Sequence, residues 1–421
     1  MKKVITYGTF DCLHEGHRRL LERAKGLGDW LIVGVTSDDY DRTRGKINAA
    51  QPLLDRVEAV KGLGLADEVL VEEYEGQKID DIRRLGVDVF TVGSDWEGKF
   101  DYLREWCEVV YLPRTEGVSS SEIRGAWREV RLGIFGAGTV AEKYRNEAAW
   151  VNGMSIGGEC GEEESGVESL ASRCDAVYIV SHPRRHAADV RAALEAGMHV
   201  LCESPVSLSG DEYRSLSALA KKRKLVLMDA IKTAYATAYN RMLLVVKSGK
   251  IGRVVSVDAT CTSLMPPWRD VPELMERWNS RQAWAPAALL AVFQLLGMEW
   301  ESVHRKSFWA EGAEDFDLFT KYDFEYEDAV ASVKVGKGVK SEGELVVSGT
   351  DGYIYVPAPW WKMDYFEERH ENQEATRRYF YQLDGEGIRA ELVEFAKVVT
   401  GGGRGCHVSE KESAAIAELV K

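Results

Sequence analysis

The chain has 421 residues, of which 45% are hydrophobic, and its 54 Lys and Arg against 68 Asp and Glu give a net charge of −14. This length predicts two or three domains, and the hydrophobic content excludes a disordered protein. The negative charge excludes a general nucleic-acid or membrane-surface partner, so anionic substrates have to be attracted by local basic groups.

The seven cysteines are scattered and form no Cys-x-x-Cys pair. This pattern favours reduced thiols over a disulfide framework or a zinc site. The sequence starts directly in a predicted strand, without a signal peptide, and no apolar run reaches membrane-spanning length. We therefore expect a cytoplasmic protein that is not inserted in a membrane.

The first predicted strand, residues 4–7, leads into Gly8-Thr9-Phe10-Asp11-Cys12-Leu13-His14-Glu15-Gly16-His17. His14 and His17 are three residues apart at a predicted helix start, so they share a face beside unpaired backbone N–H groups. Such a terminus attracts anions, and the imidazoles can donate to phosphate oxygens. A histidine pair alone is more often an ordinary surface or metal pair. The strand and turn before it instead predict a nucleotide triphosphate site.

A second anion-binding segment, residues 114–124, follows the predicted strand 109–112. Its serine run before Glu122 is typical of a helix N-terminus, and Arg114 can bind a phosphate with two parallel hydrogen bonds. A capped surface helix with an incidental arginine explains the segment equally well in isolation. Together with the histidine motif, it predicts the second wall of one phosphate cleft.

Residues 1 to about 125 resemble the glycerol-3-phosphate cytidylyltransferase family, within the nucleotidyltransferases that carry a His-x-Gly-His signature. The resemblance includes residues 92–100 and the Arg-Thr-x-Gly-x-Ser-Ser stretch that begins at Arg114. It implies a small parallel α/β sheet, CTP with Mg²⁺, and transfer of CMP to a polyol phosphate. An already anionic acceptor oxygen would attack the α-phosphorus in line, so catalysis reduces to positioning and charge stabilisation.

The same resemblance assigns the site residues of this segment. His14, His17, Lys46 and Arg114 would stabilise the triphosphate during catalysis, and Arg56 would lie near the substrate phosphates, although Pro52 replaces an expected polar residue. The other residues that the resemblance places around the nucleotide are Thr9, Phe10, Asp11, Asp95, Trp96, Thr115, Ser119 and Ser120.

A new predicted strand begins at residue 130, after a boundary near 125–129. Gly136-Ala137-Gly138 follows it and precedes a predicted helix, with Glu162 downstream. Glycines in this context let the backbone approach a pyrophosphate, and an acidic residue at this distance holds the ribose hydroxyls of NAD. A plain strand–turn–helix unit with a tight turn is the alternative.

Residues 130 to about 400 resemble the glucose-fructose oxidoreductase and inositol dehydrogenase family. The resemblance is carried by the strand 175–180, by Ser181-His182-Pro183-Arg184-Arg185-His186, and by His199 to Pro205, with later strands expected at 329–335, 345–348 and 353–356. It implies a Rossmann domain, then a large open antiparallel sheet, with NAD(H) or NADP(H). The implied cofactor residues are Gly136, Gly138, Thr139, Val140, Glu162, His182, His186 and Glu203.

This second segment departs from the family at its catalytic positions. The Glu-Lys-Pro motif reads Glu203-Ser204-Pro205, and residues 287–294 contain neither the aspartate nor the histidine of the family. Lys232 follows the predicted strand 225–228 and should emerge at the ligand-facing edge of the sheet, with Tyr235 and His186 as neighbours. We predict that Lys232 transfers a proton or binds substrate. A structural lysine is the alternative.

The sequence thus predicts an α/β protein with a cytidylyltransferase domain at 1–128, a Rossmann domain at 129–240 and an α+β domain at 241–421. Its predicted function is bifunctional, with a reductase that supplies or modifies a polyol phosphate and a cytidylyltransferase that makes a CDP-glycerol- or CDP-ribitol-type product. The family resemblance suggests teichoic acid or capsule synthesis and a homodimer or homotetramer. The alternative is a catalytically silent second segment that serves as a dimerisation or regulatory module.

Overall fold

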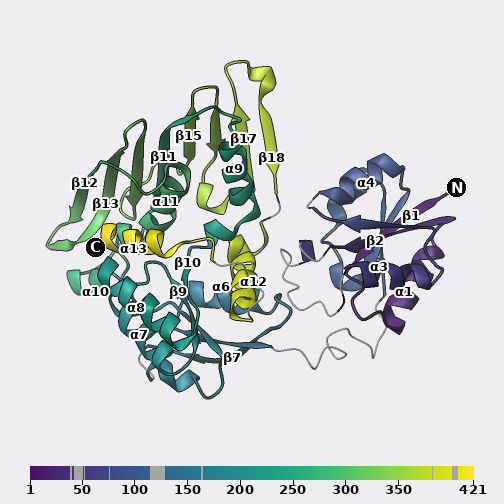
Figure 1. Cartoon of the computed structure of the whole chain (residues 1–421), viewed down its shortest axis with the longest axis horizontal. Coiled ribbons are helices and arrows are strands. Elements are labelled where there is room, and N and C mark those ends of the chain that lie inside the picture. The colour runs from purple at the N-terminus through teal and green to yellow at the C-terminus, as the bar shows by residue number, and fades with distance from the viewer. Residues whose placement is uncertain are drawn as a thin grey trace. The chain divides into compact units, whose positions relative to one another are not determined.

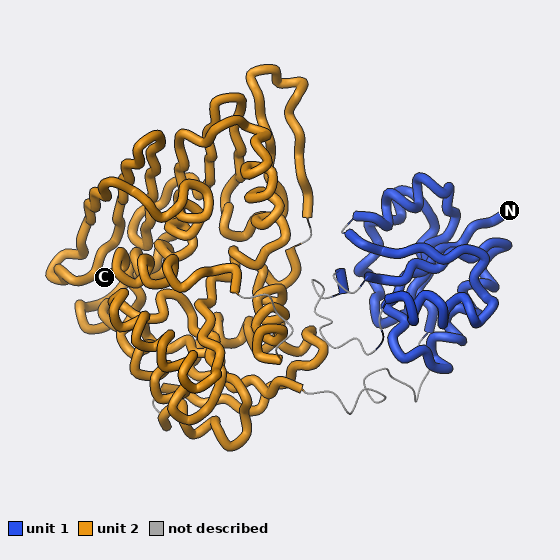
Figure 2. Tube along the Cα trace, in the orientation of Figure 1, with its two compact units in different colours: residues 1–128 blue, residues 129–421 orange. Residues whose placement is uncertain are grey.

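The computed structural model describes residues 1–37, 40–41, 51, 53–74, 76–113, 129–162, 165–381, 383–400 and 406–421 (Figure 1). The chain divides into two compact units, unit 1 from Met1 to Arg128 and unit 2 from Glu129 to Lys421 (Figure 2). The predicted α/β class is confirmed. Across the described residues no helix combines the length and the hydropathy needed to cross a membrane.

Unit 1 is built on a parallel sheet of five strands in the order β3-β2-β1-β4-β5. Along β1, Val4 packs into one hydrophobic core with Leu21, whereas Ile5 packs into a second core with Phe90, so both faces of the sheet are covered, as parallel sheets require. The elements are β1 Lys3–Gly8, α1 Glu15–Lys25, β2 Trp30–Thr36, α3 Leu53–Gly62, β3 Glu68–Glu72, α4 Gln77–Leu85, β4 Val89–Gly93, η1 Ser94–Trp96, η2 Asp101–Glu105 and β5 Glu108–Leu112.

In unit 1, β1 to β3 are added toward one edge of the sheet, and β4 and β5 are added toward the other edge. The switch point lies between β1 and β4, which pair in parallel. In open α/β sheets, ligands bind outside the carboxyl ends of the strands at such a switch point. The histidine motif follows β1, and η1 follows β4. The topology therefore places two of the predicted nucleotide-binding segments at one crevice.

Unit 2 begins with a second parallel five-stranded sheet, in the order β10-β9-β8-β6-β7. Its switch point lies between β6 and β8, so the glycine-rich turn after β6 and the start of α7 after β8 share one crevice. The elements are β6 Val130–Phe135, α6 Thr139–Ala148, β7 Met154–Cys160, η3 Val167–Leu170, β8 Ala176–Ile179, α7 Pro183–Glu195, β9 His199–Glu203, α8 Gly210–Arg223, β10 Leu227–Ala230 and η4 Lys232–Tyr235.

An eight-stranded sheet follows in unit 2, in the order β12-β13-β14-β11-β15-β16-β17-β18. The expected large antiparallel sheet is present, but it contains one parallel pair, β11 with β14. The long connection between them, which contains α11 and the β12–β13 hairpin, supplies the crossover that a parallel pair requires. The elements are α9 Thr237–Lys247, β11 Val254–Thr262, α10 Val271–Met275, α11 Ser280–Leu296, β12 Ser302–Ala310, β13 Ala313–Glu325, β14 Val330–Gly336, β15 Leu345–Gly349, β16 Tyr353–Val356, η5 Trp360–Lys362, β17 Tyr365–Arg369, η6 Gln373–Ala375, β18 Arg377–Phe380, η7 Asp384–Gly387, α12 Ile388–Val399 and α13 Glu410–Leu419.

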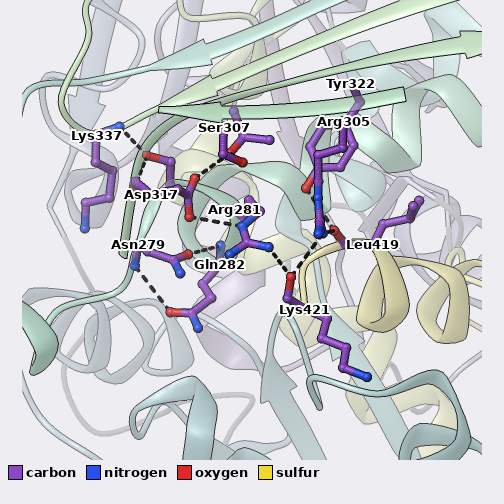
Figure 3. Close-up of polar contacts among 12 residues, drawn as sticks. Asn279, Arg281, Gln282, Arg305, Ser307, Asp317, Tyr322, Lys337, Leu419 and Lys421 are labelled. Atoms are coloured by element: carbon purple, nitrogen blue, oxygen red, sulfur yellow. Dashed lines mark hydrogen bonds and ion pairs between the residues drawn. The ribbon is translucent and has the colours of Figure 1, made fainter. Parts of the chain in front are cut away.

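Helix α11 is fixed to the eight-stranded sheet by a buried polar network (Figure 3). The guanidinium of Arg281 lies 3.1 Å from the carboxylate of Asp317 on β13 and also donates to the carbonyl of Lys421. Tyr322 donates to the carbonyl of Leu419 at 2.9 Å, which holds the end of α13 against the same strand. Because each buried charge has its partner, the network positions α11, whose first turns face the cavity described below.

Candidate functional sites

The turn between β1 and α1 is strained. Phe10 and Cys12 have φ angles of 52° and 46°, in the left-handed region that non-glycine residues avoid. The turn is held by Gln51, whose backbone N–H donates to Asp11 at 3.0 Å and whose side-chain oxygen accepts from the N–H of Cys12 at 2.9 Å. Backbone strain that the surroundings maintain is concentrated at functional sites.

His14 is the N-cap residue of α1, and its Nδ1 accepts a hydrogen bond from the backbone of Gly16 at 3.1 Å. His17 completes a capping box, because its Nδ1 accepts from the N–H of His14 at 3.4 Å. The two rings stack with centroids 3.9 Å apart. Since each Nδ1 is an acceptor, the neutral imidazoles carry their proton on Nε2, where it can be donated to a phosphate oxygen.

Arg56 lies fully buried beneath this turn rather than at an exposed position. Its Nη1 donates to the carbonyls of Thr9 and Thr36 at 2.6 and 2.9 Å, and its Nε donates to the carbonyl of Gln51 at 3.1 Å. Asp41 accepts from the hydroxyl of Thr9 at 2.9 Å. Arg56 therefore holds the loop that carries Thr9, and its predicted contact with substrate stays a prediction.

Asp95 and Trp96 lie in η1, at the carboxyl end of β4, next to the strand that leads into the histidine turn. Trp96 packs against Phe100, with ring centroids 5.9 Å apart, and borders the core that contains Phe90. The other predicted members of the site, Lys46, Arg114, Thr115, Ser119 and Ser120, lie outside the described residues.

The glycine-rich turn of unit 2 has the geometry that a pyrophosphate needs. Gly136 has a φ of +119°, and a Cβ there would lie 2.9 Å from the carbonyl of Val180, so only glycine fits between β6 and β8. Gly138 has a φ of +91°, with open space where a Cβ would be, and it begins α6 without a side-chain cap. The first-turn N–H groups, including those of Thr139 and Val140, therefore point at a site open to an anion.

Glu162 follows β7 and forms an ion pair with Arg185 on α7, at 3.3 Å. His182 is the N-cap of α7 and accepts from the N–H of Arg184 at 3.2 Å. The prediction that His186 contacts the cofactor does not agree with the structure. His186 is fully buried and its two nitrogens lie 2.8 and 2.7 Å from the carbonyls of Pro205 and Ser181, so it joins two loops instead.

A cavity of about 500 Å³ lies beside the glycine-rich turn, and Thr139, Val140, Glu203 and Lys232 line it. Helix α11 contributes Ala283, Trp284, Pro286 and Ala287 to its wall and no titratable side chain. Trp284 and Trp361 lie at a tilt with ring centroids 4.8 Å apart. Lys337 lines the cavity as well, so the cavity combines aromatic surface with the carboxyl group of Glu203 and the amino groups of two lysines. Tyr235 is buried outside the lining, stacked on His407 at 5.0 Å.

A chain of buried phenols and carboxyls begins at the cavity wall, which includes Tyr144 and Glu203. Tyr178 donates to Glu203 at 2.5 Å and stacks on Tyr144 at 3.7 Å, and Tyr144 donates to Glu391 on α12. Burial raises the pKa of Glu203 to about 7, although the hydrogen bond from Tyr178 and the charge of Lys232 lower it. Burial also holds the pKa of Glu391 well above its usual range. Glu203 can therefore hold a proton close to neutral pH.

Comparison with known proteins identifies the family of unit 1. Residues 5–126 match the family model of cytidylyltransferase-like proteins. Over 124 residues, the chain is 49% identical to a glycerol-3-phosphate cytidylyltransferase of Bacillus spizizenii and 51% identical to one of Bacillus subtilis. Each match covers 30% of this chain and 95% of the relative. The chain belongs to this cytidylyltransferase family through unit 1, which we now call the cytidylyltransferase unit.

In unit 2, residues 136–230 match the model of an oxidoreductase family with an NAD-binding Rossmann fold. Two similar solved structures each align with 69% of this chain. The 3-ketoreductase KijD10 from Actinomadura kijaniata has a TM-score of 0.61 at 17% identity over 96% of its chain. The UDP-N-acetylglucosamine 3-dehydrogenase from Acidithiobacillus ferrooxidans has a TM-score of 0.58 at 18% identity over 95% of its chain. These structures establish the fold of unit 2.

Sequence reasoning missed three residues near the cavity of unit 2. Lys143 on α6, Lys362 on η5 and Glu386 on η7 meet Lys232, although they are far apart along the chain. Only the Gly385-Glu386-Gly387 run carried a local signal, because a charged residue between two glycines before a helix is typical of a special turn. Lys143 and Lys362 have no comparable signal in the sequence around them.

Glu203 should make the stability of unit 2 depend on pH. Its pKa rises from 4.5 to about 7 on folding, so the folded state binds a proton that the unfolded state releases, and stability falls as pH rises through this window. We expect Glu203→Gln to reduce this slope by up to about 1.4 kcal/mol per pH unit, the contribution of one proton. Burial also raises the pKa of Asp229 to about 6 and raises that of Glu391. The stability of the Glu203→Gln variant should therefore still fall as pH rises, with a smaller slope.

Urea unfolding of the full chain, measured at several pH values between about 5 and 7, tests this expectation. Glu394→Gln is the matched control, because it removes a half-buried carboxylate that pairs with Lys397 at 2.9 Å, away from the cavity lining. An equal slope in Glu203→Gln and in the parent would contradict the assignment.

Proposed function

We propose that the chain is a bifunctional enzyme. The cytidylyltransferase unit transfers CMP from CTP to a polyol phosphate of the glycerol or ribitol type and releases pyrophosphate. Unit 2 reduces a carbonyl precursor of that polyol phosphate, or modifies it, with NAD(H) or NADP(H). The observation that carries the first activity is the stacked His14–His17 pair at the start of α1, in a segment about half identical to glycerol-3-phosphate cytidylyltransferases.

In the cytidylyltransferase unit, catalysis requires no covalent protein nucleophile, because the acceptor phosphate is already an anion. His14 and His17 donate to the triphosphate from the N-terminus of α1, where the helix dipole adds positive potential. Lys46 and Arg114 complete the charge stabilisation. Mg²⁺ accompanies CTP, whose phosphates supply its ligands. No cluster of three His, Cys, Asp or Glu in the described parts of the chain is arranged to hold a metal ion.

In unit 2, the uncapped start of α6 and the open space beside Gly138 support binding of the cofactor pyrophosphate. The reduced nicotinamide supplies a hydride when it is bound. Lys232 either stabilises the negative charge that develops on the substrate oxygen or binds the substrate phosphate, and Glu203, whose pKa burial raises to about 7, lines the same cavity. Trp284 and Trp361 offer flat surfaces to the carbon chain of the substrate.

The family resemblance supports a place for this enzyme in synthesis of a cell-envelope polymer such as teichoic acid or capsule. Joining the two activities in one chain has a chemical rationale, because the product of unit 2 would be the acceptor of the cytidylyltransferase unit. We further propose that the protein works in the cytoplasm as a homodimer or homotetramer.

A second candidate function is favoured by a specific observation. Ser204 stands where the family has its lysine, and α11 offers no titratable group to the cavity. Unit 2 would then be a silent dinucleotide-fold module for dimerisation or regulation. Titration of the full chain with NADH, followed by a screen of sugar-phosphate ketones and aldehydes as substrates, distinguishes a reductase from a silent module. Absence of NADH binding would support the silent module, whereas NADH oxidation with any of these compounds would exclude it.

The ion pair of Glu162 with Arg185 leads to a prediction on cofactor choice. Glu162 can accept hydrogen bonds from a ribose 2′-hydroxyl and would repel a 2′-phosphate, so NAD(H) should bind more tightly than NADP(H). Glu162→Ala should narrow this gap by about tenfold, because it removes one charge and leaves Arg185 for the 2′-phosphate. Fluorescence titration measures the dissociation constants of NAD(H) and NADP(H). Glu159→Ala, which breaks a 2.6 Å ion pair with Arg145, is the control, and an unchanged gap in Glu162→Ala would refute the prediction.

A further inference from the structure

Three lysines from separate elements of unit 2 converge on one carboxylate. The Nζ of Lys143 on α6 lies 2.9 Å from each oxygen of Glu386. The Nζ of Lys232 on η4 lies 3.0 Å from Oε2, and the Nζ of Lys362 on η5 lies 2.8 Å from Oε1. We call these three side chains the lysine triad. Each has 28–40% of its surface exposed, so the triad is reachable from solvent.

Glu386 is presented to the triad by a turn in an unfavourable conformation. Gly385, Glu386 and Gly387 have φ angles of 56°, 56° and 89°, and the left-handed region costs a non-glycine residue free energy. Burial alone would raise the pKa of Glu386, but the hydrogen bonds from the triad outweigh it and lower the pKa to about 2. The contact with the lysines is therefore the interaction that compensates the cost of this conformation.

The charges of the triad are only partly balanced. Three ammonium groups face the single carboxylate of Glu386, whereas the nearby carboxylates of Glu147 and Asp384 are bound by Arg389 at 3.0 and 3.5 Å. Burial raises the pKa of Glu203 and of Glu391, which reduces the negative charge that these two carboxyls place near the triad. A phosphomonoester carries up to two negative charges and three strong acceptor oxygens, one for each lysine.

The triad adjoins the cavity of unit 2. Lys232 lines it directly, and Lys143 and Lys362 are the sequence neighbours of two more lining residues, Tyr144 and Trp361. A phosphate at the triad would therefore leave the attached carbon chain inside a space of about 500 Å³ beside the glycine-rich turn. The 2′-phosphate of a cofactor is expected elsewhere. Its ribose belongs beside Glu162 after β7, at the opposite edge of the sheet from β10, which precedes Lys232.

We propose that Lys143, Lys232 and Lys362 form the phosphate subsite of unit 2, in which the phosphomonoester of a sugar or polyol phosphate displaces Glu386. The identity of the carbon chain rests on the proposed function, but the anion site itself does not. Glu386 acts as an internal competitor that occupies the subsite when no phosphate ester is bound.

Titration calorimetry of the full chain with glycerol phosphate, inorganic phosphate and glycerol tests the subsite. All proteins carry His17→Gln, which weakens the phosphate site proposed for the cytidylyltransferase unit. We expect Lys143→Met and Lys362→Met each to weaken binding of glycerol phosphate and inorganic phosphate by about tenfold. Glu386→Gln should tighten binding of both anions severalfold, because it removes the charge that competes for the lysines. Glycerol should bind weakly to all variants.

Lys321→Met is the matched control. Its Nζ pairs with Asp323 at 2.7 Å and its side chain is 41% exposed, against 40% for Lys143, but it lies on β13 and not at the cavity. Unchanged phosphate binding in both triad variants, or weaker binding in Glu386→Gln, would overturn the proposal. So would a loss of NADP affinity, relative to NAD, in the triad variants. The titration measures phosphate binding without NADH turnover. It therefore distinguishes failure of the phosphate subsite from failure of the proposed reductase activity.

Discussion

Replacement of His14 by Asn and of His17 by Gln should each lower the rate of CDP-polyol formation by about 100-fold, the usual cost of one preorganised charge-stabilising donor. Both substitutions keep the start of α1, because Asn is a good N-cap residue and Gln at the third helical position can complete a capping box. Both substitutions remove the imidazole Nε2–H group, which we propose donates a hydrogen bond to the triphosphate. Pyrophosphate release from CTP and glycerol phosphate measures the effect.

His14→Ala is the informative comparison, because it removes both the imidazole and the cap and should also cost about 1 kcal/mol of stability. If the Asn variant recovered the parent rate while the Ala variant did not, the histidine would serve only as a cap. A truncated chain that ends at residue 128 should keep the activity, since the relatives of the cytidylyltransferase unit are about as long as that unit. Loss of activity on truncation would instead assign unit 2 a supporting role.

Replacement of Lys232 by Met should abolish carbonyl reduction and leave cytidylyl transfer unchanged. Methionine keeps much of the side-chain volume and removes the charge that lines the cavity and pairs with Glu386 at 3.0 Å. Loss of a developing-charge stabiliser lowers kcat, whereas loss of a phosphate ligand raises KM for the phosphorylated substrate. Steady-state kinetics of NADH oxidation with a phosphorylated carbonyl compound and with its dephosphorylated analogue separate the two contributions.

The matched control is Lys397→Met, which removes a lysine of similar exposure, 23% against 28%, that pairs with Glu394 and lies outside the cavity lining. Equal NADH binding in both variants would show that the fold survives. A parent-like rate of carbonyl reduction in Lys232→Met would show that the lysine is structural.

The sequence alone determined the features that depend on neighbouring residues. A strand, a turn and a helix start depend on neighbouring residues. The sequence therefore predicted the histidine motif of the cytidylyltransferase unit, with His14 and His17, and the glycine-rich turn of unit 2, with Gly136 and Gly138. The loss of the family lysine at Ser204 was equally visible. Helix capping by His14 follows from the same short-range geometry, because the capping partners lie within three residues.

The tertiary structure decided everything that depends on side chains brought together from distant segments. The Nζ of Lys143 and the carboxylate of Glu386 are hydrogen-bonded across 243 positions of sequence, and Tyr144 and Glu391 across 247. His186 was predicted to be a cofactor ligand from its place after β8, but it lies in the first turn of α7, and its side chain is buried against the carbonyls of Ser181 and Pro205. Local pattern fixes backbone conformation and helix ends, whereas burial and ion pairing between separate elements exist only after the sheets and helices have packed.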